Sequence, residues 1–334
     1  MTAVPLRFRE DGSFVLVQLT DLHVRDGDED DLRTLRLVED VLEIEKPDLV
    51  VFTGDVVGGD DCRDPRAALR RALAPVVARA LPWAFAFGNH DDEGPATRLE
   101  LLDVLAEHRG FVGERGPVEL PGAGNYVVRL HASRGDGLAA ALWVLDSGGA
   151  NASGIGDYEW FSVSQVGWYR ETARALAAEC GGRPVPALAF FHIPLPEYAE
   201  AWETTVCRGF RLEPVCAAAV NAGLYAAFLE AGDVLGVFVG HDHLNDFEAD
   251  LRGVRLVYGR ASGHGGYGRD GFRRGARAVR LREGERRFET WVRLDDGSLA
   301  QRPPHEPESW GTVRSESGNP ATAAGPPAGV KEQA

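Results

Sequence analysis

Long hydrophobic runs are missing from this chain. No stretch reaches the roughly 18 consecutive apolar residues that a membrane-spanning helix requires, and the first ten residues lack the apolar core of a signal peptide. The four cysteines show neither CxxC spacing nor the density of a disulfide scaffold. These absences predict a cytoplasmic protein with reduced thiols, and a Cys207–Cys216 bridge is the minor alternative.

Positive charge is also scarce. The formal net charge is −15, from 36 basic and 51 acidic residues, and only Lys46 and Lys331 are lysines. Nucleic acids and anionic membrane surfaces attract proteins through clustered cations, so we expect neither as a main partner. With 44% hydrophobic and 26% charged residues over 334 positions, the composition is that of a globular protein able to bury a full core.

Strand-like and helical patterns alternate along most of the chain, which predicts one α/β domain over residues 1–300. Apolar runs typical of buried strands occur at residues 14–19, 49–52, 83–87, 138–145, 187–191 and 234–239. Between them, Asp64 and Pro65 are expected to open a helix and Gly232 to close another. The Pro-, Gly- and Ala-rich composition beyond residue 300 predicts a disordered tail over residues 301–334.

Residues with metal-binding side chains follow five of these strands. The motifs, in order, are Leu-Thr-Asp-Leu-His, Thr-Gly-Asp, Gly-Asn-His-Asp, Phe-Phe-His-Ile-Pro and Gly-His-Asp-His. Because the carboxyl ends of parallel strands open into one crevice, we expect the motif side chains to converge there. The candidate metal ligands are Asp21, His23, Asp55, Asn89, His192, His241 and His243.

The chemistry of these side chains suits a pair of cations. His241 and His243 are two residues apart, like the Asp and His of the first motif, so on an extended backbone each pair would face one way. The carboxylate of Asp55 could bridge two ions, and Asn89 adds a neutral oxygen. Mixed nitrogen and oxygen ligands favour Mn, Fe, Zn, Co or Ni over Mg and Ca. The lack of cysteine in the set argues against a structural zinc site.

Taken together, the five motifs resemble those of the calcineurin-like metallophosphoesterase superfamily over most of residues 14–260. Residues 145–147 (Leu-Asp-Ser), 192–198 and 240–246 are similar to a branch that holds fungal phosphatases and plant proteins named purple acid phosphatases by similarity. The resemblance implies a four-layer α/β/β/α sandwich. True purple acid phosphatases have a glycine at the position of His23 and a tyrosine ligand at that of Gly58, so no tyrosinate–iron centre is expected.

The resemblance also implies a role for each motif residue. A hydroxide bridging the two ions would attack the phosphorus. His90 would protonate the leaving oxygen or stabilise the phosphoryl charge, and Asp91 would orient the His90 ring. One ion would be held by Asp21, His23, Asp55 and His243, and the other by Asp55, Asn89, His192 and His241.

The implied function is hydrolysis of phosphate esters, of a small molecule or a phosphoprotein, with two divalent or trivalent ions as cofactors. The branch resemblance favours a phosphomonoesterase. A phosphodiesterase acting on a cyclic nucleotide or another diester is the alternative, and a non-catalytic interaction module on the same fold is a third hypothesis.

Two arginines and two segments are further candidates near the site. Arg260 and Arg25 follow strand ends and could clamp phosphoryl oxygens. The aromatic connection at residues 194–210 is predicted to form a wall of the substrate site. The acidic run at residues 26–31 suits either a helix cap or a rim that disfavours highly anionic substrates.

Overall fold

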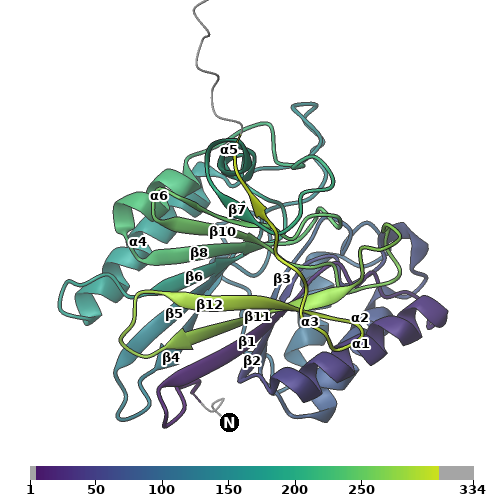
Figure 1. The fold of residues 1–334 in the computed structure, drawn as a ribbon, viewed down its shortest axis with the longest axis horizontal. Helices are drawn as coiled ribbons and strands as arrows, with labels where there is room; N and C mark the ends of the chain where they lie inside the picture. The colour runs from purple at the N-terminus through teal and green to yellow at the C-terminus, as the bar shows by residue number, and fades with distance from the viewer. Residues whose placement is uncertain (1–4, 308–334) are drawn as a thin grey trace, which may run out of the picture.

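Two β-sheets pack face to face in the computed structural model, which describes residues 5–307 (Figure 1). The smaller sheet contains, in spatial order, β12 (Phe288–Leu294), β11 (Gly275–Arg282), β1 (Ser13–Leu19), β2 (Leu49–Thr53) and β3 (Trp83–Ala86). The larger sheet contains β13 (Pro304–His305), β7 (Cys207–Arg208), β9 (Glu248–Leu251), β10 (Val254–Tyr258), β8 (Val234–Val239), β6 (Ala187–Phe190), β5 (Leu138–Val144) and β4 (Tyr126–His131).

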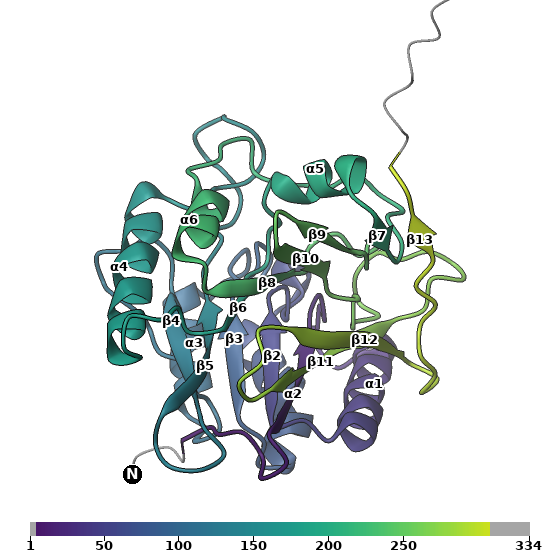
Figure 2. The same ribbon diagram turned by 60° about the vertical axis from the view of Figure 1, so that its left-hand side comes forward.

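Helices cover the outer faces of both sheets (Figures 1 and 2). The smaller sheet carries α1 (Glu29–Glu45), α2 (Pro65–Ala78) and α3 (Arg98–Ala106), and the larger one α4 (Val163–Glu179), α5 (Glu197–Thr204) and α6 (Leu224–Ala231). As predicted, Asp64 caps α2 with Pro65 in its first turn, and Gly232 ends α6 with φ 65°. Asp28 caps α1, so the acidic run serves the start of a helix.

Alternation along each strand divides the core into layers. On β1, Val17 and Leu19 pack against the helices, whereas Phe14 and Leu16 face the larger sheet. The larger sheet divides its side chains in the same way between the inter-sheet core and α4–α6. Burying each such side chain contributes about 1.5–3 kcal/mol. Three apolar layers thus join four layers of secondary structure, and the predicted α/β/β/α sandwich is confirmed.

Parallel pairing brings the carboxyl ends of the motif-bearing strands to one edge in each sheet. The chain runs parallel through β1–β2–β3 and through β5–β6–β8–β10. Each parallel set therefore ends its strands at one edge, and the motif residues follow β1, β2, β3, β6 and β8 directly.

The ordered domain continues past residue 300, where the sequence predicted a disordered tail. β13 pairs antiparallel with β7, and the ring of His305 stacks on Trp202 at a centroid distance of 3.8 Å. Arg302 forms an ion pair with Glu248 and donates to the carbonyl of Thr290 at 2.8 Å. A prediction from average composition missed this short anchored segment. Residues 308–334, to which the rest of that prediction applies, lie outside the described residues.

Two further expectations concern the thiols and the membrane. All four cysteines are free, so no Cys207–Cys216 bridge forms. Within residues 5–307, no helix combines the length and the apolar character needed to cross a bilayer.

Candidate metal centre

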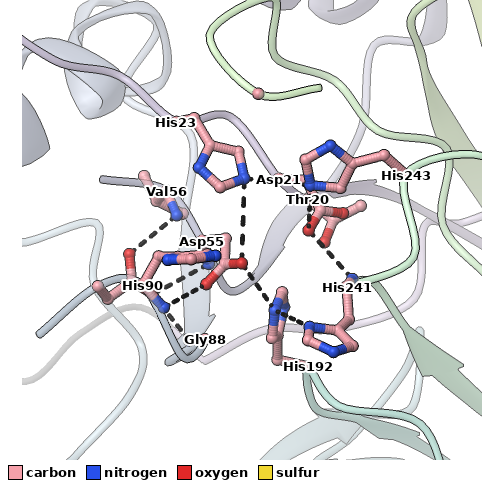
Figure 3. Close-up of polar contacts among 12 residues, drawn as sticks. Thr20, Asp21, His23, Asp55, Val56, Gly88, His90, His192, His241 and His243 are labelled. Atoms are coloured by element: carbon pink, nitrogen blue, oxygen red, sulfur yellow. Dashed lines mark hydrogen bonds and ion pairs between the residues drawn. The ribbon is translucent and has the colours of Figure 1, made fainter. Parts of the chain in front are cut away.

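Six of the seven predicted ligands form two groups of three buried side chains (Figure 3). Within each group the candidate ligand atoms lie within 4.8 Å of one another. Asp55 lies between the groups, with its Oδ2 3.0 Å from His192 Nε2 and 3.9 Å from His23 Nε2. The first group is Asp21, His23 and His243, and the second is Asp55, His192 and His241.

Asn89, the seventh predicted ligand, has a buried oxygen without a partner. The side chain is 5% exposed, and its Oδ1 makes no hydrogen bond within residues 5–307. Leaving such a group unpaired costs about 1–3 kcal/mol, so a cation is a fitting partner for it. Two carboxylates, four imidazoles and this amide oxygen also match the mixed donor set that transition metals take. The residues present therefore fit the two ions that the resemblance implies.

Backbone carbonyls fix the rings of two of these histidines. His192 Nδ1 lies 2.8 Å from the carbonyl oxygen of Thr53, and His243 Nδ1 lies 2.9 Å from that of Tyr267. Because a carbonyl only accepts, each Nδ1 carries a proton and each Nε2 faces the site. Hydrogen bonds of this kind hold a metal-ligating ring in its orientation.

Strained backbone aims several ligands. Asp21, His23, Asp55 and His241 have φ values of 54°, 48°, 50° and 77°, and non-glycine residues in this left-handed region cost about 1–3 kcal/mol each. The expected extended backbone is therefore absent at these residues, although Asp21 and His23 still fall in one group. Tight turns after the strands aim each side chain separately, and His243 belongs to a different group from His241.

Glycines precede the ligands because the strand ends approach very closely. A Cβ on Gly88 would lie 2.2 Å from Asp55 Oδ1, and one on Gly54 would lie 2.6 Å from His192 Nδ1. Both distances are far shorter than a van der Waals contact. The Gly-Asp and Gly-Asn-His motifs thus need glycine to bring the ligands together.

Burial and the charge of Asp55 set the pKa values of three of these histidines. Burial lowers the pKa of His23 and of His241 to about 3, so both rings are neutral, the form that binds a cation. At His192 burial also acts to lower the pKa, but the Asp55 carboxylate outweighs it and the pKa rises to about 9. The pKa of Asp55 stays well below its usual range despite burial, because His192 favours its charge. This pairing stabilises positive charge beside Asp55.

His90, in the third motif, lies next to Asp55, whose carboxylate accepts its backbone N–H. Asp91 does not orient the His90 ring. The carboxylate of Asp91 is 1% exposed and accepts the backbone N–H of Gly88, Asp55, Val56 and Val57 at 2.8 to 3.1 Å. Burial and the charge of Asp55 raise the pKa of Asp91 to about 7. The group at Nδ1 of His90 is Glu93. Sequence reasoning chose the adjacent carboxylate, whereas the tight turn presents the one three positions on.

Neither predicted phosphate clamp reaches the two groups. Arg260 is 4% exposed, pairs with Asp246 at 2.5 Å and lies over the ring of Phe272. Arg25 pairs with Asp28 at 2.8 Å, beside the start of α1. Both arginines hold loops in place, a role that surface-charge patterns in a sequence do not reveal.

A cavity of about 380 Å³ opens onto both groups, and several residues that the sequence did not single out line it. The predicted wall at residues 194–210 is not part of it. Tyr198 of that segment is fully buried, and Trp202 packs on Phe247. Besides candidate ligands and His90, the lining includes Tyr158, Tyr267, Cys216, Asp60, Asp61 and Glu93.

Comparison with known proteins places this geometry in a family. Residues 14–245 match the model of the calcineurin-like phosphoesterases. A protein of Arabidopsis thaliana named "Probable inactive purple acid phosphatase 29" is 34% identical, over 88% of this chain and 86% of its own length. "Phosphatase DCR2" of Saccharomyces cerevisiae is 33% identical, over 87% of this chain and 55% of its own length.

A solved structure shares the fold. A dimetal phosphatase from Danio rerio superposes with a TM-score of 0.61 at 14% identity, covering 87% of this chain and 98% of that one. The motif order, the sandwich and the two side-chain groups agree with the match over residues 14–245, and the chain belongs to the calcineurin-like phosphoesterase family.

Proposed function

We propose that this protein is a metal-dependent phosphoesterase that hydrolyses phosphate esters, most readily monoesters. The observation that carries the proposal is the position of Asp55 between two buried ligand groups. The buried, unpartnered oxygen of Asn89, in the loop that follows β3, supports it. The names of three Arabidopsis relatives call them inactive. In this chain every motif position keeps a side chain able to bind a cation or transfer a proton.

The site residues divide into metal ligands and residues that transfer protons or hold the motif loops. The two groups and Asn89 would hold two transition-metal ions, with Asp55 shared between them. When bound, such ions activate water for attack and offset the charge of the phosphoryl group. His90 would hold the proton that the leaving oxygen takes up. Asp91 ties the second and third motif loops together through its four backbone hydrogen bonds.

One feature of the cavity favours the diester alternative. Its lining contains the carboxylates of Asp60, Asp61, Glu93 and Asp242, and no arginine or lysine among the described residues that form it. A phosphodiester carries one negative charge where a monoester carries up to two, so these acids oppose a diester less. Diester hydrolysis is therefore the second candidate.

Activity of the reloaded enzyme tests both candidates. The protein is stripped of metal, reloaded in turn with Mn, Fe, Zn, Co, Ni and Mg, and assayed on p-nitrophenyl phosphate and bis-p-nitrophenyl phosphate. We expect a transition metal to restore turnover of the monoester. Preference for the diester would support the second candidate. Stable binding of two ions without turnover of either ester would contradict the proposal and favour a non-catalytic module.

Substrate and location stay predictions. A small molecule or a phosphoprotein is the proposed substrate, and neither nucleic acid nor a membrane surface is proposed as a partner. The charge of the chain supports this, since only 36 of its residues are basic against 51 acidic ones. The cytoplasm is the proposed location, which the four free cysteines support.

A further inference from the structure

The turn that follows Asn89 brings a carboxylate onto the ring of His90. The backbone N–H of Glu93 donates to the carbonyl of His90 at 3.4 Å, which closes a tight turn. The Oε2 of Glu93 contacts Nδ1 of the His90 ring. Both side chains line the cavity, with 43% of His90 and 33% of Glu93 exposed. Glu93 therefore meets the ring at the rim of the site.

The carboxylates next to Glu93 in the loop interact with groups other than the His90 ring. Asp91 accepts four backbone N–H groups, as described above, and Asp92 pairs with Nε of Arg98 at 3.1 Å. Asp55 accepts the backbone N–H of His90 at 2.8 Å, which places the residue but leaves the ring free to turn. Of the carboxylates around His90, Glu93 is thus the one that contacts an imidazole nitrogen.

Gly59 makes room for this contact from another part of the chain. It has φ 59°, and a Cβ built on it would lie 2.6 Å from Glu93 Oε2 and 3.5 Å from the Cβ of His90. Any side chain at this position would therefore push the carboxylate off the ring. Gly59 lies in the loop that follows Asp55, so two motif loops together create the space for Glu93.

We infer that Glu93 is a positioning residue for His90, an inference that rests on the proposed function. Its carboxylate accepts a hydrogen bond from the Nδ1–H group of His90, which leaves Nε2 as the nitrogen that serves the substrate. A water-derived oxygen forms the new P–O bond as the ester P–O bond breaks, and the electron pair of the broken bond stays on the leaving oxygen, which takes the proton from Nε2. His90 becomes neutral and keeps its Nδ1 proton, hydrogen-bonded to Glu93. The next water returns a proton to Nε2 as it becomes the nucleophile of the following turnover.

Two variants disturb the contact from opposite sides. Glu93→Ala removes the acceptor, whereas Gly59→Ala displaces it and leaves both partners in the chain. Glu93→Gln keeps an oxygen acceptor without the charge, so its ring signals and its kcat should fall between those of Glu93→Ala and wild type. Asp103→Asn is the matched control, because it removes an exposed carboxylate from α3, away from the cavity.

The first readout is the proton position on the ring. Zinc-loaded protein with 15N-labelled histidine is compared by two-bond 1H–15N correlation spectra, in which His90→Ala identifies the His90 signals. At a pH at which the resting His90 ring is neutral, we expect its single proton on Nδ1 in wild type and in Asp103→Asn, and a shift of this proton towards Nε2 in Glu93→Ala and Gly59→Ala. Unchanged ring signals in Glu93→Ala would overturn the inference, whatever the activity.

The second readout is the dependence of the rate on the leaving group. Phenolate is a poorer leaving group than p-nitrophenolate and needs the proton more. On the phenyl ester of whichever class wild type hydrolyses, Glu93→Ala should lose about 10- to 100-fold in kcat, with bound metal unchanged. The loss on the p-nitrophenyl ester should be clearly smaller. Equal losses on both esters would overturn the inference, because a purely structural role predicts them.

The two readouts separate failure of this inference from failure of the proposed function. A wild-type protein without turnover on any ester would contradict the proposed function, and the ring signals would still show whether Glu93 holds His90. If Glu93→Ala and His90→Ala share the same leaving-group selectivity, the positioning role is supported.

Discussion

Arg98 and Asp146 form a buried ion pair that joins the start of α3 to the loop after β5. Asp146 is fully buried at its side chain and Arg98 is 9% exposed there. Arg98 also donates to the carbonyl of Gly88 at 3.0 Å, directly before Asn89. The second oxygen of Asp146 accepts the N–H of Ala123 at 2.7 Å. Through its bond to Gly88, the pair therefore holds the Gly-Asn-His-Asp loop in place.

Replacing Arg98 should destabilise the fold strongly. Arg98→Met keeps much of the volume but leaves the Asp146 carboxylate buried without its cation, which costs about 3–5 kcal/mol. Urea unfolding of both proteins measures the loss. Arg70→Met is the matched control, because Arg70 pairs with Glu107 at the surface, where a pair contributes about 0–1 kcal/mol. Equal losses in the two variants would contradict the structural importance of the buried pair.

Asp55→Asn should remove metal binding together with activity. The carboxylate lies between the two ligand groups, and an amide lacks the charge needed to hold two cations. The change is nearly isosteric, so the fold should survive. Metal analysis of the purified variant by inductively coupled plasma mass spectrometry, beside its rate on p-nitrophenyl phosphate, checks this. Full occupancy by two metals would show that Asp55 is not shared between them.

His90→Ala should separate rate from metal content. The ring lies at the rim and belongs to neither ligand group, so both ions should stay bound. Loss of a positioned proton donor costs about 10²- to 10⁴-fold in rate. The same metal analysis and assay apply. Metal loss equal to that of Asp55→Asn would refute the division of roles between the two residues.

The sequence predicted the fold and the ligand groups because both depend on local patterns. Alternating and continuous apolar runs located β1, β2 and β3, and the strand ends located Asp55 and Asn89. Parallel pairing then brings such residues to one edge whatever the details of the loops.

Side-chain orientation and distant partners could not be predicted in this way. Whether Asp91 or Glu93 contacts His90 depends on the dihedral angles of one turn. The role of Arg260 depends on Asp246, fourteen positions away, which neutralises it in the interior. Short anchors such as His305 on Trp202 are equally hidden, because they rely on contacts between distant parts of the chain.

Asp233 should make the stability of the fold depend on pH. Its buried carboxylate accepts from Trp143 Nε1 at 3.0 Å and from the hydroxyl of Tyr169, yet burial outweighs these bonds and raises its pKa. The folded state therefore holds the proton more tightly than the unfolded chain. The stability gained from protonation is present below the ordinary value of about 3.9 and is lost as pH rises through the raised pKa.

Asp233→Asn removes this titration. The free energy of unfolding of the variant, relative to wild type, should therefore rise between acid and neutral pH. Urea unfolding over that range measures the difference. A difference that stays constant or falls with pH would show that the pKa of Asp233 is not raised in the fold.

A chain that ends after residue 307 should be more stable than one that ends after residue 300. The longer chain keeps the stacking of His305 on Trp202, with an angle of 8° between the rings, and the pair between Arg302 and Glu248. An aromatic pair contributes about 0.5–1.5 kcal/mol and a partly exposed ion pair somewhat less, so we expect a loss of about 1–2 kcal/mol. His305→Ala in the longer chain isolates the stacking contribution. Equal unfolding midpoints for the two chain lengths would mean that β13 contributes nothing to the domain, since its removal also exposes the face of Trp202 that His305 covers.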